Sequence, residues 1–540
     1  KDANDMVLFD KADVYYDATF NISMERHKRI KIFNENGKNE ANVRIEYISG
    51  GHLQYITGLQ AETINLNSDG QVEITKLDRK QMYIESIDKA RSAYVFAFPN
   101  VRPGSVIEFK YKWTTQAFYN FPEWYFQGSL PERYSELITR IPSAFYFRLQ
   151  SHVHDPFVIN KTATENGAFG YGSGYSVEVM TRALANVHSI TDEPYMRSLA
   201  DNLQGFTFQL TSIHPINGFV TNYSNTWAKA GGILADDEDF GGQFKKKLAN
   251  EDVIITQAKA LPSDKEKIVY LFNEVKKDIK WDGVDEWYTN DGIAKAWEKK
   301  MGNSAEINLI LYHLLRQTGV EAYPMVVSTR SHGMVNPAIT FLYQFNRTVV
   351  NIPVDSVHYY ILDATSKYNM VNEIPDELLN STCLLIDKDN KKYTTLFLQR
   401  NAPVTKIVYV NAAIQPDGNM TGTLVINGNS YNRINAVKKY KTDGEQKYLD
   451  YLRNNDNTIK LSDFKMQNLD VDTLPLFQTA NFKQELTGSD GNYIYFVPSL
   501  FAPARVNPFI KETRQTEMDF GYRNNFTMTG TCKLPQGYKT

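Results

Sequence analysis

The stretch MGNSAEINLILYHLLRQTG, residues 301–319, has the spacing of an amphipathic helix. Its apolar side chains recur at helical intervals and form one stripe, made of Ile307, Ile310, Leu311, Leu314 and Leu315. Asn303 is suited to cap the start of this helix, and Gly319 to the left-handed residue that follows its end. The sequence therefore predicts a helix over residues 303–318.

Strands are predicted after this helix at Glu321–Thr329, Phe345–Ile352 and His358–Leu362. Before it, residues 264–280 form a second helical pattern, with Ser263 as a plausible N-cap. This mixture of helices and strands indicates an α+β core.

The flanking regions favour β-structure. β-Branched or alternating runs recur between turn signals before residue 226 and again after about residue 396, where one helical stretch is expected at residues 444–452. We therefore predict a multidomain α+β protein with an N-terminal β-sandwich at residues 1–225, a central core at 226–395 and a C-terminal β-rich domain at 396–540.

Three short segments carry a family resemblance. Gly302-Asn303-Ser304, Phe345-Asn346-Arg347 and Leu362-Asp363-Ala364-Thr365 resemble the transglutaminase-like branch of the papain-type cysteine enzymes. In that family a Gly-x-Cys opens a buried helix, a His starts one strand and an Asp ends the next. The resemblance implies a transglutaminase-like fold for the central core.

The catalytic triad of that family is degenerate in this chain. Ser304 stands where the nucleophilic Cys belongs, Arg347 stands where the His belongs, and Asp363 matches. A helix dipole contributes at most about 2 kcal/mol, or about 1.5 pKa units, which activates a thiol but not a hydroxyl. Arg347 is protonated at any working pH and cannot act as the base. The three positions are therefore expected to be inactive.

Histidines elsewhere offer an alternative base. His313 lies nine residues after Ser304, about 13.5 Å along the helix axis, and His358 lies on the opposite strand face from Asp363. His332 lies in a predicted loop and could reach Ser304. The favoured interpretation is an ion pair between Arg347 and Asp363 with Ser304 hydrogen-bonded nearby; the alternative is an anionic ligand held by Arg347.

The N-terminal region carries a second resemblance. The segments Arg29–Ile32, Phe98–Val101 and Gly104–Glu108 look like a domain of uncharacterised function that precedes transglutaminase-like domains in exported bacterial proteins. Asp192–Met196 and Asp237–Gly241 also fit that architecture. The resemblance implies a periplasmic, cell-surface or secreted location. No signal peptide opens the sequence, as expected of a mature or trimmed chain.

Composition excludes several classes of function. The 540 residues carry a net charge of −3, whereas a dedicated nucleic-acid binder would show a basic excess. No apolar run reaches the ~18 residues of a membrane span, and two cysteines cannot form a disulfide framework. Two segments are considered as metal sites, the pair His152 and His154 and the acidic run Asp236–Asp239. A structural role is the favoured interpretation of both. No metal or cofactor is predicted.

Three hypotheses for function remain. The first is a catalytically inactive transglutaminase- or protease-like protein that binds or scaffolds an unknown partner, a protein or a glycan, at the bacterial cell envelope. The second is an active hydrolase or acyltransferase, such as a protease, that uses Ser304 as nucleophile. The third is a glycan-binding module whose aromatic run Phe118–Phe126 stacks on sugars; that run could equally be a seam between domains.

Overall fold

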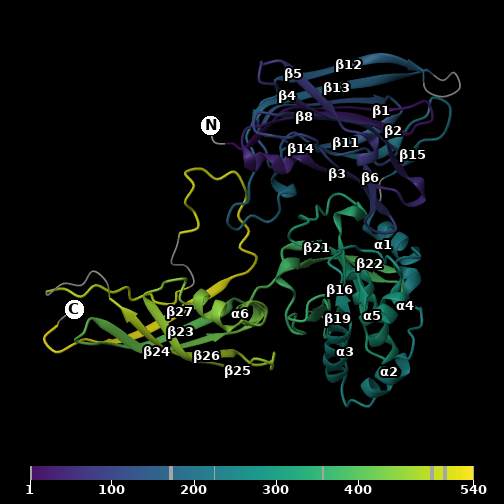
Figure 1. Ribbon diagram of the computed structural model, residues 1–540. Helices are drawn as coiled ribbons and strands as arrows, with labels where there is room; N and C mark the ends of the chain where they lie inside the picture. Colours follow the sequence, from purple (N-terminus) through teal and green to yellow (C-terminus); the bar gives the residue numbers. More distant parts are fainter. Residues whose placement is uncertain are drawn as a thin grey trace. The chain divides into compact units, whose positions relative to one another are not determined.

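The computed structural model describes residues 3–168, 174–223, 226–355, 358–486, 492–502 and 507–538. The chain divides into two compact units. Figure 1 labels many of their helices and strands. The first contains Lys1–Thr226, Pro337–Phe341 and Arg514–Glu517, and the second contains Trp227–Asn336, Leu342–Thr513 and Met518–Thr540. The predicted domain boundaries at 225/226 and 395/396 stay predictions; Ser224 and Asn225 lie outside the described residues.

The first unit is built from strands. They are β1 Asp5–Tyr16, β2 Ile22–Ile32, β3 Asn42–Ile48, β4 Gln54–Leu66, β5 Val72–Lys76, β6 Tyr83–Ser86, β7 Arg91–Ala97, β8 Val106–Thr115, β9 Trp124–Tyr125, β10 Glu132–Pro142, β11 Phe145–His152, β12 Ile159–Ala168, β13 Gly174–Val187, β14 Gly205–Ile213 and β15 Thr221–Asn222.

The described residues of this unit form three sheets. An eight-stranded sheet has the order β12-β13-β10-β1-β2-β8-β4-β5, in which β1 and β10 run parallel and the other neighbours antiparallel. The smaller sheets are β11-β14-β15, with β9 paired to β14, and β3-β7-β6. The large sheet and the smaller ones share one hydrophobic cluster, so the sheet-rich N-terminal region that the sequence predicts is present.

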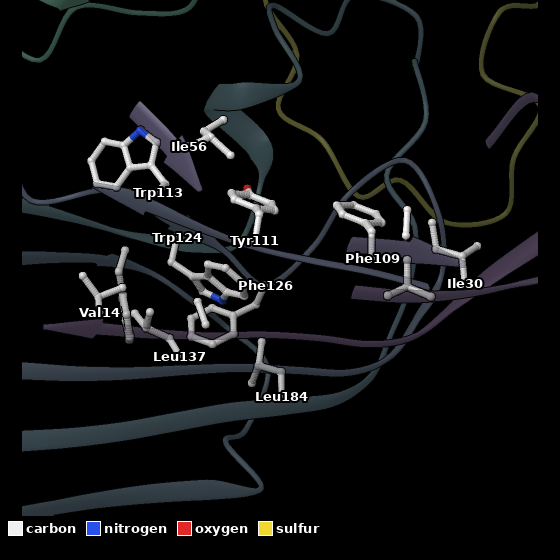
Figure 2. Close-up of a cluster of buried hydrophobic side chains, with 14 of the residues drawn as sticks. Val14, Ile30, Ile56, Phe109, Tyr111, Trp113, Trp124, Phe126, Leu137 and Leu184 are labelled. Atoms are coloured by element: carbon white, nitrogen blue, oxygen red, sulfur yellow. The ribbon is translucent and has the colours of Figure 1, made fainter. Parts of the chain in front are cut away.

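The aromatic run at residues 118–126 contributes to this cluster. Figure 2 shows Trp124 and Phe126 among the buried side chains, beside Leu137 and Val14. Phe126 is 0 % exposed and Phe121 only 2 %. These rings fill the core of the unit and cannot stack on a sugar, because a stacking platform must be open to solvent.

A short segment from late in the chain completes the first unit. The Glu193 carboxylate accepts hydrogen bonds from the backbone N–H of Gln515 (3.1 Å), the backbone N–H of Thr516 (3.0 Å) and the Thr516 hydroxyl (2.7 Å). The Asn202 side chain accepts a further bond from the N–H of Glu517, 3.0 Å away. Residues 514–517 therefore belong structurally with the first unit.

The second unit begins with a mixed α+β part. Its helices are α1 Trp227–Asp236, α2 Glu251–Lys259, α3 Asp264–Asp278, α4 Ile293–Lys299 and α5 Ser304–Gln317. Its strands are β16 Lys280–Trp281, β17 Met301–Gly302, β18 Tyr323–Val327, β19 Arg347–Pro353, β20 Tyr359–Leu362, β21 Ser381–Asp387 and β22 Lys392–Leu398.

Helix α5 is more deeply buried than its sequence predicts. Every residue from Ser304 to Leu315 is buried, including polar Asn308 and His313, not only the predicted stripe. The helix packs against α3, α4 and β19 of an antiparallel sheet with the order β20-β19-β18-β21-β22. It is the central helix of this part, with neighbours around its first three turns.

The second unit ends in a C-terminal sheet. Its elements are β23 Val404–Ile414, β24 Asn419–Gly428, α6 Ser430–Asp443, α7 Glu445–Leu452, β25 Ile459–Gln467, β26 Leu476–Glu485 and β27 Asn524–Lys533. The strand order is β25-β26-β24-β23-β27, with β27 parallel to β23. The helix expected at residues 444–452 is confirmed as α7, whereas α6 was not expected. Among the described residues, no helix is long and apolar enough to cross a bilayer.

Candidate functional site

The start of α5 is closed by a reciprocal cap. The Asn303 side chain accepts the N–H of Glu306, and the Glu306 carboxylate accepts the N–H of Asn303, both at 2.9 Å. Glu306 also accepts the backbone N–H groups of Asp291 and Gly292. Burial raises the pKa of Glu306, although these bonds oppose the rise. The predicted cap is confirmed, and it also fixes the loop that precedes α4.

Ser304, the first residue of α5, is 0 % exposed and bonded to a neighbouring loop. Its hydroxyl donates to the carbonyl oxygen of Glu286 and accepts the Glu286 N–H, both at 3.2 Å. Its own N–H donates to the carbonyl of Val284, 3.1 Å away. Within the described residues, no imidazole is a hydrogen-bond partner of Ser304. The hydroxyl therefore links the start of α5 to the backbone of the loop at residues 284–286.

Arg347, the first residue of β19, is surrounded by carboxylates. Its Nε lies 2.9 Å from Oδ1 of Asp285 and its Nη2 lies 2.7 Å from Oδ2. Its Nη1 lies 2.9 Å from Oδ2 of Asp363 and also bonds Oε1 of Glu377, a residue of the short 3₁₀ helix Asp376–Leu378. The guanidinium therefore meets three carboxylates while the residue is only 2 % exposed.

The electrostatics of this cluster fix the charge of Arg347. Burial alone would lower the pKa of Arg347, but the carboxylates, Asp363 first, raise it above its ordinary value. Burial raises the pKa of Glu377, and Arg347 opposes that rise. Arg347 thus holds its proton firmly, which is the opposite of what a general base requires.

Asp363 connects the cluster to α5. It follows β20 and is 0 % exposed. Its Oδ1 accepts the Asn308 side-chain amide (2.9 Å) and the N–H of Thr365 (3.0 Å). Asn308 also donates to the carbonyl of Thr348 (2.9 Å) and accepts the N–H of Ala364 (2.8 Å). One amide therefore joins the central helix, β19 and the segment after β20.

The structure brings together two of the three predicted site residues. Arg347 and Asp363 form an ion pair, whereas Ser304 bonds to neither and contacts the 284–286 loop instead. Ser304 is hydrogen-bonded to the backbone of Glu286, the residue next to Asp285, because this loop offers both a donor and an acceptor.

The histidines considered as alternative bases have other partners. His313 Nε2 lies 2.6 Å from a Glu251 carboxylate oxygen, and His332 Nδ1 lies 3.0 Å from the Ser328 hydroxyl. His358 Nδ1 lies 2.7 Å from Asp355. A Ser304–His332 hydrogen bond is not formed.

Sequence reasoning missed Asp285, Glu377 and Asn308. Asn308 lies four residues after Ser304 on the same helix, so i, i+4 spacing could have placed it on the same face. Asp285 and Glu377 lie in segments without a repeating pattern, and no local signal distinguishes them from surface acids. In the described ranges, no three His, Cys, Asp or Glu side chains gather closely enough to hold a metal ion.

One of the tryptophans before α5, Trp281, lies against the cluster. The Arg347 guanidinium carbon lies 5.6 Å from the ring centre of Trp281, within cation–π range. The Trp281 indole N–H donates to the carbonyl of Val284, 2.9 Å away. Trp281 therefore packs between the arginine and the loop that binds Ser304.

Comparisons with known proteins give a fold but no activity. Residues 19–169 match the model of DUF3857, a domain of unknown function with a solved structure. No curated protein matches the chain. A crystal structure described as a putative protease from Parabacteroides distasonis ATCC 8503 aligns over 92 % of this chain and 95 % of its own, with 12 % identity and a TM-score of 0.52. The chain therefore shares the fold of that solved structure along most of its length.

A second solved structure is a weaker match. It is yeast LTA4 hydrolase in complex with bestatin, which aligns over 36 % of this chain and 30 % of its own at 9 % identity. Its TM-score is 0.17, so no inference about this protein rests on it.

Proposed function

We propose that this protein is a catalytically inactive relative of the transglutaminase-like, papain-type enzymes, with a binding or scaffolding role at the bacterial cell envelope. The observation that supports the loss of activity is the position of Arg347. A guanidinium held by Asp285, Asp363 and Glu377 occupies the place where the resemblance puts the general base.

The state of Ser304 supports the same proposal. A serine nucleophile needs a base within hydrogen-bond reach of its hydroxyl and an open path for substrate. The Ser304 hydroxyl is instead fully buried and bonded to both backbone groups of Glu286. In place of a reactive triad, Ser304, Arg347 and Asp363 make hydrogen bonds and ion pairs that hold the helix, the sheet and the loop together.

The binding role is supported by what the rest of the chain resembles. The DUF3857 match falls in the sheet-rich first unit, where the sequence resembles domains of exported bacterial proteins. A fold shared along 95 % of a solved protease-like chain supports retention of the whole architecture rather than of its core alone. A protein or a glycan partner fits this role; in the aromatic run at 118–126, Phe121, Trp124 and Phe126 are buried, whereas Tyr119 and Tyr125 are exposed.

The test of inactivity is covalent labelling of Ser304. Folded protein would be treated with a fluorophosphonate probe and examined by intact mass, beside the variant Ser304→Ala and an active serine hydrolase as positive control. We expect no adduct on the folded wild-type chain. An adduct that the Ser304→Ala variant lacks would overturn the proposal and establish Ser304 as a nucleophile.

A further inference from the structure

A cavity of about 540 Å³ in the second unit has five cationic side chains among its thirteen lining residues. It lies between α3, the segment after β20, α6 and the connection from β25 to β26. Its cationic residues are Lys276, Lys277, Lys367, Arg433 and Lys441. Two acidic residues, Asp470 and Asp472, also line it, so the cavity has an excess of positive charge.

Arg433 is the deepest of these cations. It is 4 % exposed, and its guanidinium donates to the carbonyl oxygens of Asn468 (Nη1, 2.8 Å) and Leu469 (Nη2, 3.0 Å). No carboxylate of the described residues lies within ion-pairing distance of it. Burial lowers the pKa of Arg433, although Asp472 and Asp470 oppose this from farther away. A buried cation without a paired anion is costly.

Lys276, on α3, also lacks a paired anion within the described ranges. Its ammonium donates to the carbonyl of Asn369, 2.7 Å away, and lies 4.2 Å from the ring centre of Phe272. Among the described residues no carboxylate lies within ion-pairing distance of Lys276, although Asp472 acts on it from farther away. Burial lowers the pKa of Lys276 to about 8.

The neighbouring lysines show that pairing is available in this region. Lys441 forms an ion pair with Asp470, and Lys277 lies 3.8 Å from Glu274. Lys367, at the rim, lies 5.2 Å from the ring centre of Tyr368 and has no ion-pair partner in the described part of the chain. The cavity is therefore lined both by these two paired lysines and by three cations without an ion-pair partner among the described residues, Arg433, Lys276 and Lys367.

We propose that this cavity binds a small organic anion with two or more negative charges, carried by phosphate or carboxylate groups. Arg433 and Lys276 supply the inner contacts, since a guanidinium matches either group with two hydrogen bonds and an ammonium adds a point charge. The volume suits a small molecule. Met370, Ile434 and Val437 on the lining offer contact to its carbon skeleton.

This inference is independent of the proposed function. The cavity shares no residue with the Arg347 cluster, and an active or an inactive Ser304 leaves it unchanged. Labelling at Ser304 and binding in the cavity therefore succeed or fail separately.

The test is calorimetric titration of the full chain with inorganic pyrophosphate and with citrate at fixed ionic strength. The variants are Lys276→Gln and Arg433→Gln, and the matched control is Lys438→Gln, which removes an exposed charge from α6 that does not line the cavity. We expect one site in the wild type and the control, and an affinity about tenfold or more weaker in each cavity variant. Circular dichroism checks folding, and Lys276→Gln keeps the test decisive if Arg433→Gln does not fold.

The two probes distinguish the sources of negative charge. Tighter binding of pyrophosphate indicates a phosphorylated ligand, and tighter binding of citrate indicates a polycarboxylate. The inference is overturned if neither probe binds the wild type at millimolar concentration, or if Lys276→Gln binds as well as Lys438→Gln.

Discussion

The side chains of Arg347 and Asp285 meet at two points, Nε to Oδ1 at 2.9 Å and Nη2 to Oδ2 at 2.7 Å. This pairing leaves Nη1 for Asp363 and Glu377. A single guanidinium therefore lies between three carboxylates that would otherwise repel one another more strongly. The stability of the core consequently depends on Arg347 more than on any one of its partners.

Replacement of Arg347 by Leu should destabilise the protein strongly at pH 7. The loss should be about 3–5 kcal/mol of unfolding free energy, because the buried Asp363 carboxylate loses its counter-charge. Burial already raises the pKa of Glu377, and without Arg347 nothing opposes the rise. A carboxylate whose pKa is raised in the folded state stabilises at low pH and loses that effect as pH rises.

The loss of unfolding free energy caused by Arg347→Leu should therefore become smaller as pH falls from about 7 to about 5. Urea denaturation of the wild type and the variant at both values measures it. Arg347→Lys is the control: it keeps a positive charge without the two-point geometry and should lose less. An equal deficit for Arg347→Leu at both pH values would contradict this account of the cluster.

Replacement of Asn308 by Asp should also destabilise the protein in a pH-dependent way. The change puts a second carboxylate where an amide now donates to Asp363 at 2.9 Å, and adjacent like charges in a buried site disfavour ionisation. Thermal unfolding at pH 7 and pH 5 should show partial recovery in acid. Asn308→Ala removes the same hydrogen bond without adding charge, so its loss should change much less with pH.

Two adjacent glycines of α1 should respond in opposite directions to alanine. A Cβ on Gly231 would overlap Cβ and Cγ of Tyr393 on β22, and those atoms cannot move without their strand. We expect Gly231→Ala to lose about 1–3 kcal/mol from overpacking. A Cβ on Gly232 would lie 3.7 Å from Cε2 of Tyr393, an ordinary contact. Gly232→Ala should gain up to about 1 kcal/mol from helix propensity.

Chemical denaturation of both glycine variants beside the wild type checks this pair. The two positions are adjacent in one helix, so a general effect of alanine on α1 would move them together. Equal losses at both positions would mean that the close approach of α1 to β22 is not what requires glycine.

The titration of Lys276 should make stability rise with pH above about 8. Its pKa falls from 10.5 to about 8 in the folded state, so between these values the unfolded chain binds a proton that the folded chain does not. The charged groups that face it are Lys277 on its own helix, Lys367 after β20, Arg433 and Lys441 on α6, and Asp470 and Asp472. The affinity for pyrophosphate should fall across the same range, as Lys276 loses its charge.

Stability curves of wild type and Lys276→Gln from pH 7.5 to 10 would isolate this effect. The difference in unfolding free energy between the wild type and Lys276→Gln should increase with pH, because all other titrating groups are common to both chains. If the curves run parallel, Lys276 keeps an ordinary pKa and its burial is compensated elsewhere.

The structural features that could be predicted have local signals in the sequence. Helix α5 follows from its apolar spacing, and its ends follow from Asn303 and Gly319, whose φ of +84° suits a residue without a side chain. The pairing of Arg347 with Asp363 was foreseeable because their separation fits two adjacent antiparallel strands. In each case the interaction lies within a short segment or between neighbouring strands.

Contacts between residues far apart in the sequence could not be predicted. Asp285 and Glu377 meet Arg347 from irregular segments far away in sequence, and no spacing rule joins them. Helix α6 was missed because its sequence is largely polar and only Ser430, Tyr431, Arg433 and Val437 are buried, so it lacks a strong apolar stripe. The parallel pairing of β1 with β10 depends on the path of the intervening chain, not on the pattern of either strand.

The bonds from Glu193 to residues 515 and 516 set an order for biosynthesis. Proteins emerge from the ribosome N-terminus first, and early domains begin to fold while later residues are still being joined. Here the partners of Glu193 are made 322 and 323 residues after it. The nascent first unit must wait through the translation of almost all of the second before its last hydrogen bonds can form, so its final maturation is necessarily a late event.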